Sequence, residues 1–66
     1  MPSAAAIANL KLAEQAMYLA QQELMKFISA SDRFTPDGIA EHRRLADNVM
    51  QKTNEYMEAF RTTAAS

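Results

Sequence analysis

The side chains of this chain that could take part in chemistry are few, and five of them follow one helical line. Lysine, glutamine and tyrosine recur three or four residues apart, at Lys11, Gln15, Tyr18, Gln22 and Lys26. Lysine neutralises phosphates, glutamine donates and accepts hydrogen bonds, and a tyrosine ring can stack on a base. Contact with RNA is therefore one hypothesis for this set, which we call the Lys–Gln–Tyr ridge. An ordinary solvated helix surface is the alternative interpretation, because Lys and Gln are also good helix formers.

The single histidine, His42, is the other side chain with distinctive chemistry. It has no cysteine, second histidine or acid one turn away on its own face, so we interpret it as a packed interface residue. The chain also lacks a nucleophile beside a base, a glycine-rich phosphate loop and the spacings typical of zinc sites. We therefore expect no catalytic residues, no metal ligands, no cofactor and no enzymatic activity.

Two capping signals predict the elements that carry these side chains. Ser3 precedes an alanine-rich run, and Thr35 precedes Pro36 at the first position of a second helix, where proline is tolerated. Helices are predicted at about residues 4–28 and 36–62, with a polar turn at 29–35. Two long helices joined by a short turn should form one antiparallel, all-α hairpin domain covering residues 1–66.

Both predicted helices carry hydrophobic positions at alternating spacings of three and four residues. In the first helix, small and large side chains alternate along this line, which comprises Ala6, Leu10, Ala13, Met17, Ala20, Leu24 and Phe27. A similar line in the second helix comprises Ile39, His42, Ala46, Met50, Thr53, Met57 and Phe60. We expect these two lines to face each other in the hairpin.

Further apolar residues widen both faces beyond what one neighbouring helix can cover. They are Leu12 and Leu19 beside the first line, and Leu45, Val49 and Tyr56 beside the second. A chain of 66 residues without cysteine has little core and no disulfide to support it. We therefore predict a homodimer in which two hairpins form a four-helix bundle, with all these apolar residues in the core or the interface.

This pattern resembles the Rop family of plasmid copy-number regulators. The similarity lies in the length, the two helices, the alternating small and large core layers, and a first-helix face of lysine, amide and aromatic side chains. The resemblance implies a dimeric four-helix bundle that reads RNA through the Lys–Gln–Tyr ridge. The turn and the spacing of the lysines differ from that family, and Glu14 and Glu23 lie near the ridge.

The balance of seven basic and eight acidic residues gives no general attraction to nucleic acids or anionic membranes. The first twenty residues contain no basic leader, and Asn9, Lys11 and Glu14 interrupt their apolar run, so we expect a cytoplasmic protein without membrane contact. The leading hypothesis is a non-enzymatic regulator or adaptor that acts as a homodimer. The alternatives are a Rop-like RNA-binding regulator, and a secretion-system subunit, chaperone or phage-type inhibitor that folds against a partner protein.

Overall fold

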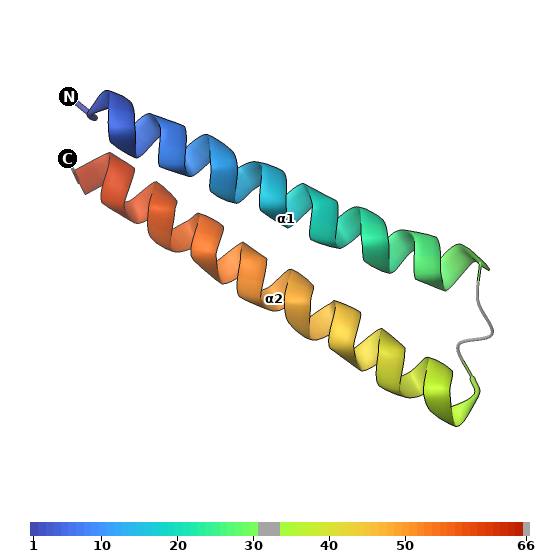
Figure 1. Cartoon of the computed structure of the whole chain (residues 1–66). Helices are drawn as coiled ribbons and strands as arrows, with labels where there is room; N and C mark the ends of the chain where they lie inside the picture. Colours follow the sequence, from blue (N-terminus) through green and yellow to red (C-terminus); the bar gives the residue numbers. More distant parts are fainter. Residues whose placement is uncertain (31–33, 66) are drawn as a thin grey trace.

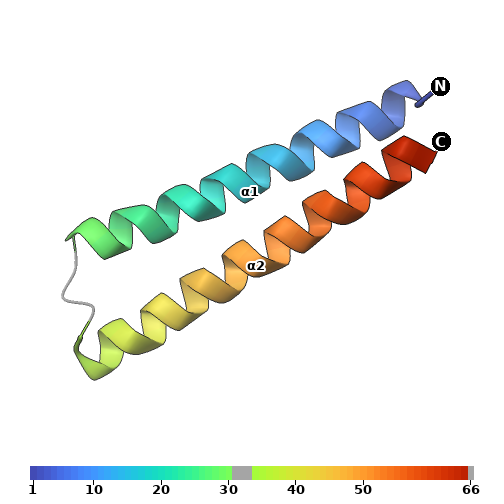
Figure 2. The ribbon, with the colours of Figure 1, turned by 180° about the vertical axis from the view of Figure 1, so that it is seen from behind.

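Two long helices account for nearly all the residues that the structure, a computed structural model, describes, namely 1–30 and 34–65. Helix α1 covers Ala4–Ala30 and helix α2 covers Pro36–Ala65. They lie side by side and run in opposite directions, so that both termini are at the same end (Figure 1, Figure 2). The predicted all-α hairpin is confirmed, whereas its association into a four-helix bundle stays a prediction.

Both helices begin where the capping signals placed them. The Ser3 hydroxyl oxygen accepts a hydrogen bond from the Ala6 amide at 3.1 Å. The Thr35 hydroxyl oxygen accepts one from the Gly38 amide at 3.0 Å. Each cap thus satisfies a backbone N–H that has no partner within its own helix.

The helices end later than the sequence predicted. Ser29 and Ala30 belong to α1, and residues 31–33 of the predicted turn lie outside the described residues. At the other end, α2 continues through Thr63 to Ala65. The buried Thr63 hydroxyl explains this extension, since it is 3.2 Å from the Ala6 carbonyl oxygen and 2.8 Å from the Ala59 carbonyl oxygen and joins the last turn of α2 to the first turn of α1.

The line predicted for the first helix does face α2, because all seven of its residues are buried or half-buried. Opposite it lies a line of α2 residues that are also buried or half-buried: Gly38, His42, Leu45, Val49, Lys52, Tyr56, Ala59 and Thr63. Near the turn, the His42 and Phe27 rings pack across this junction with centroids 6.3 Å apart. We call these two lines together the seam.

Apart from His42, which does lie in the seam, the residues of the line predicted for α2 are each one position away from the seam. Ile39, Met50, Met57 and Phe60 are exposed to solvent rather than packed against α1, and the other three members of that line are half-buried. The reason is that two neighbouring lines on α2 both advance in steps of three and four residues. The one that fits the alanine-rich line of α1 is the one with Ala59 and Thr63, which let the backbones approach closely near the termini.

Side-chain size also changes along the seam. Alanine and threonine meet at the termini, where the helices lie close together, whereas Phe27, His42 and Leu45 lie near the turn, where the ribbons are further apart (Figure 1).

Within the described residues, neither helix contains an apolar stretch of the length that a bilayer crossing requires.

Candidate functional site

One broad face of the hairpin is formed by the residues that directly follow the seam residues in sequence. In an antiparallel helix pair, these positions of both helices lie on the same side. On α1 they are Ile7, Lys11, Glu14, Tyr18, Gln21, Met25 and Ile28. On α2 they are Ile39, Arg43, Ala46, Met50, Thr53, Met57, Phe60 and Ala64, which we call the α2 stripe. We call the two sets together the apolar face.

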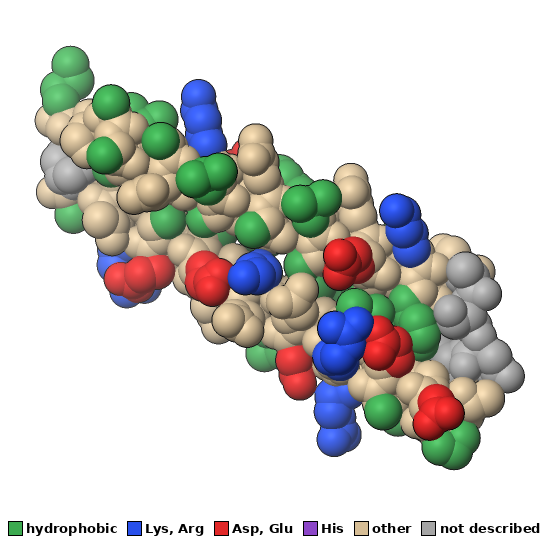
Figure 3. All heavy atoms as spheres, in the orientation of Figure 1, with side chains coloured by type: hydrophobic (Ala, Val, Ile, Leu, Met, Phe, Trp, Pro, Cys, Tyr) green, Lys and Arg blue, Asp and Glu red, His purple; other side chains and the backbone are tan. Residues whose placement is uncertain are grey.

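The opposite broad face consists of the residues that directly precede the seam residues. On α2 these are mainly charged or amide side chains: Asp37, Glu41, Arg44, Asn48, Gln51, Glu55, Glu58 and Thr62. Figure 3 shows side chains of both charges gathered over α2 and along the junction, with hydrophobic side chains along α1. The Glu41 carboxylate, through a hydrogen bond and its charge, raises the pKa of Arg44, and the charge of Glu23 on α1 adds to this effect. We call this opposite broad face the charged face.

Ion pairs within α2 lie along or beside the charged face. The Arg44 Nε donates to Glu41 Oε2 at 3.1 Å, and Arg44 Nη2 donates to the other oxygen of the same carboxylate. This hydrogen-bonded pairing lowers the pKa of Glu41 and raises that of Arg44. Arg61 pairs with Glu58 at 3.0 Å and Lys52 with Glu55 at 3.4 Å. These ion pairs therefore neutralise charges of α2 along this side of the hairpin.

On the apolar face, by contrast, large hydrophobic side chains are exposed to water. Met50, near the middle of the α2 stripe, is 63% exposed, and Ile39, Met57 and Phe60 are each more than half exposed. The only charged side chains at the positions of this face are Lys11, Glu14 and Arg43. A contiguous exposed strip of this kind is typical of an interaction surface.

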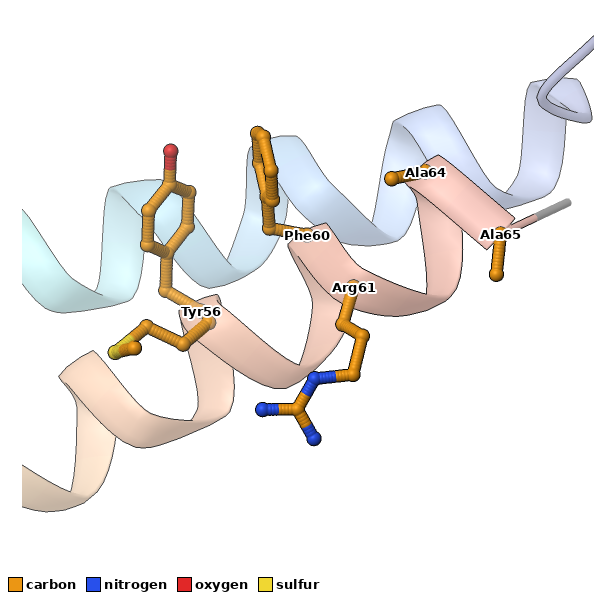
Figure 4. Close-up of a pocket in the computed structure, with 6 residues that line it drawn as sticks. Tyr56, Phe60, Arg61, Ala64 and Ala65 are labelled. Atoms are coloured by element: carbon orange, nitrogen blue, oxygen red, sulfur yellow. The ribbon is translucent and has the colours of Figure 1, made fainter.

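An open hollow lies at the terminal end of the α2 stripe. It is lined by Tyr56, Met57, Phe60, Arg61, Ala64 and Ala65. The Tyr56 and Phe60 rings project from α2 in the same direction, and Arg61 points away from them (Figure 4). Their centroids are 6.4 Å apart. The hollow exists because Ala64 and Ala65 leave the space beside Phe60 unfilled.

The five residues of the Lys–Gln–Tyr ridge are all exposed on α1. Gln15, Tyr18 and Gln22 lie together around a shallow hollow, and a second hollow lies between Tyr18 and Lys26. The two lysines do not share a face, because Lys11 follows a seam residue and Lys26 precedes one. The ridge therefore winds around the outer side of α1, and its contact with RNA stays a prediction.

The remaining predicted apolar residues divide between the seam and the surface. Leu45, Val49 and Tyr56, expected beside the main line of α2, form the seam itself. Leu12 and Leu19 are exposed on the charged face. Sequence reasoning missed Gly38, Lys52, Ala59 and Thr63 as seam residues, although their regular spacing was a signal that could have found them.

His42 packs against Phe27 within the seam. Among the described residues, no group of three or more His, Cys, Asp or Glu side chains is arranged to hold a metal ion. Comparison of the chain with protein-family models, curated proteins and solved structures gives no match.

Proposed function

We propose that this chain is a non-enzymatic interaction protein of the cytoplasm, a small regulator or adaptor, and that it works as a homodimer. In this proposal, two hairpins join through their apolar faces to form a four-helix bundle. The observation that carries it is the α2 stripe, in which Ile39, Met50, Met57 and Phe60 are each more than half exposed on the isolated hairpin.

The distribution of buried area supports association. Among the described residues, the buried hydrophobic side chains are Met17, Ala20 and Leu45, at 9%, 3% and 5% exposure. By contrast, eleven large hydrophobic residues in the described part of the chain are exposed. A single core in a chain this short rarely supplies more than about 3–5 kcal/mol. Covering the apolar face would remove several of these side chains from water and stabilise the fold.

The size of the apolar face also suits a stable dimer. The Cα trace extends 50 × 15 × 11 Å, so the outline of one broad face covers roughly 750 Å², about the area that each partner buries in a standard-size interface. Two partners would bury roughly 1,500 Å² in total, which is within the range of stable protein interfaces.

The concentration dependence of unfolding tests the proposal. If the hairpin is stable only as a dimer, its thermal midpoint by circular dichroism should rise as the protein concentration is raised from about 1 to 100 µM. A strongly helical chain with a midpoint independent of concentration would contradict the homodimer. A chain that is weakly helical at every concentration and gains helicity only with another protein would also contradict it, and would favour the partner-folded alternative.

RNA binding is a second candidate function, favoured by the exposure of all five side chains of the Lys–Gln–Tyr ridge. Lysine contacts to phosphate make such binding weaker as salt is raised. The double variant K11A/K26A should lose binding to an RNA stem-loop in a low-salt titration while keeping its helicity. K52A is the matched control, because Lys52 lies in the seam and pairs with Glu55. Equal affinity of K11A/K26A and the unmodified chain would remove this candidate.

A further inference from the structure

We infer that a second copy of the chain covers the apolar face with its α2 antiparallel to the first α2, about a two-fold axis that passes between Met50 and Thr53. This inference rests on the proposed homodimer and adds which helices meet, in which direction and in which register.

The charges on the apolar face decide which helices meet. The α2 stripe carries one charged residue, Arg43, whereas the corresponding positions of α1 include Lys11 and Glu14. Placing α2 on the partner's α1 would set both charges against the α2 stripe, whereas with like helices adjacent Lys11 faces the partner's Met25 and Glu14 faces the partner's Gln21, so a single charge faces a methionine. Placing α2 on the partner's α2 brings apolar side chains together. When two hairpins stack face to face with like helices adjacent, two-fold symmetry requires these helices to run antiparallel.

The order of large and small side chains in the α2 stripe then selects the register. About an axis between Met50 and Thr53, each large aliphatic or thioether side chain faces a small one. Ile39 faces the partner's Ala64, Met57 faces the partner's Ala46, and Met50 faces the partner's Thr53. Two antiparallel copies of the α2 stripe are thus complementary in side-chain size, and every residue of the stripe has a counterpart in the partner.

The two neighbouring registers, displaced by one heptad, lack this fit. One places Ile39 against the partner's Met57, and the other places Met50 against the partner's Phe60. Each therefore sets two large side chains against each other, and each leaves one end of the stripe without a counterpart. Such contacts force helices apart, whereas alternating large and small layers allow close packing.

The same register accounts for the hollow and for Arg43. The partner's Ile39 enters the hollow at the point where Ala64 leaves space. The partner's Arg43 lies opposite Phe60, and an arginine over an aromatic ring is an attractive cation–π arrangement. Thus Arg43, the one charged residue of the stripe, has a favourable aromatic neighbour in the partner's Phe60.

The register also determines which α1 residues of the two copies face each other. Thr63 contacts Ala6 and His42 packs on Phe27, so the midpoint of the α2 stripe lies beside Met17 and Tyr18. The two copies of Tyr18 therefore approach each other near the axis. Ile7 approaches the partner's Ile28, which extends the apolar contact to both ends of α1.

Spin-label distances test this arrangement, and the absence of cysteine makes single labels straightforward. N54C and A40C place labels on exposed positions of α2 outside the apolar face. In the inferred register, the two labels at position 54 are separated by roughly 8 Å along the bundle axis, and those at position 40 by roughly 35 Å. Double electron–electron resonance should therefore give a much longer distance for A40C than for N54C.

Disulfide exchange supplies a second readout. A mixture of A46C and M57C should form a mixed disulfide dimer, whereas A46C alone should not, because its two cysteines lie roughly 16 Å apart along the axis. Equal label distances at positions 40 and 54, or homodisulfides in place of the mixed one, would overturn the inferred register while the homodimer stands. A monomer by sedimentation would instead overturn the proposed function itself.

Discussion

Leu19 and Met50 have nearly the same exposure, 60% and 63%, yet they lie on opposite faces of the hairpin. Around Leu19, the facing helix contributes glutamate, arginine, asparagine and glutamine, and charged partners there are already paired. Around Met50, α2 contributes a line of apolar side chains along nearly its whole length. Exposure alone therefore does not identify an interface, because the chemistry of the neighbouring positions determines whether covering a side chain is favourable.

The substitution with the largest expected effect is M50E. It puts a carboxylate at the centre of the α2 stripe, twice in each dimer, so dimerisation should weaken by more than about 100-fold and helicity should fall with it. Sedimentation equilibrium with circular dichroism measures both quantities.

L19E is the matched control for M50E, since it introduces the same charge at a side chain of the same exposure. It should leave the dimer intact. Dissociation by L19E but not by M50E would assign the interface to the charged face instead of the apolar face.

Truncation of the seam comes next in size. Leu45 is 5% exposed, so L45A leaves a cavity between the helices and should lower the free energy of unfolding by about 2–5 kcal/mol. Urea denaturation measures this change. L12A truncates an exposed leucine on the charged face and should change stability by less than about 0.5 kcal/mol. Equal losses for the two variants would show that α1 and α2 do not meet along the described seam.

A smaller effect is expected at the terminal end of the seam. T63V keeps the shape of Thr63 but removes the hydroxyl that lies within hydrogen-bond distance of the Ala6 and Ala59 carbonyl oxygens. The free energy of unfolding should fall by about 1 kcal/mol, and amide hydrogen exchange should quicken in the last turn of α2. T62V, at the adjacent exposed residue, is the control. Unchanged exchange in T63V would contradict the role of this contact in holding the last turn.

The smallest effect concerns the charged face. Pairing with Arg44 lowers the pKa of Glu41 in the folded state, so this carboxylate contributes stability above the ordinary carboxyl range and loses it as the pH falls through its folded pKa. E41Q should lower the thermal midpoint slightly at pH 7 and low salt, and the difference should vanish at acidic pH or in 1 M salt. A difference that persists at acidic pH would show that Glu41 acts through packing instead.

Local features of this molecule could be predicted from the sequence. The caps at Ser3 and Thr35 depend on side chains and backbone amides three residues apart, and the α1 line is marked by alanine alternating with large residues. The α2 line could not be chosen by hydrophobicity, because two lines with steps of three and four residues lie about one residue apart and share His42. The more hydrophobic line lies on the exposed surface of α2 rather than in the seam, because the packing of α2 depends on its fit to α1, a property of both helices together.

Sedimentation equilibrium of the unmodified chain over a range of concentrations shows whether the hairpin associates. A homodimer should appear as a strongly helical species of twice the 7.4 kDa chain mass. A helical, folded species that stays at 7.4 kDa throughout the micromolar range would contradict it, since the apolar face would then be stable in water without a second copy.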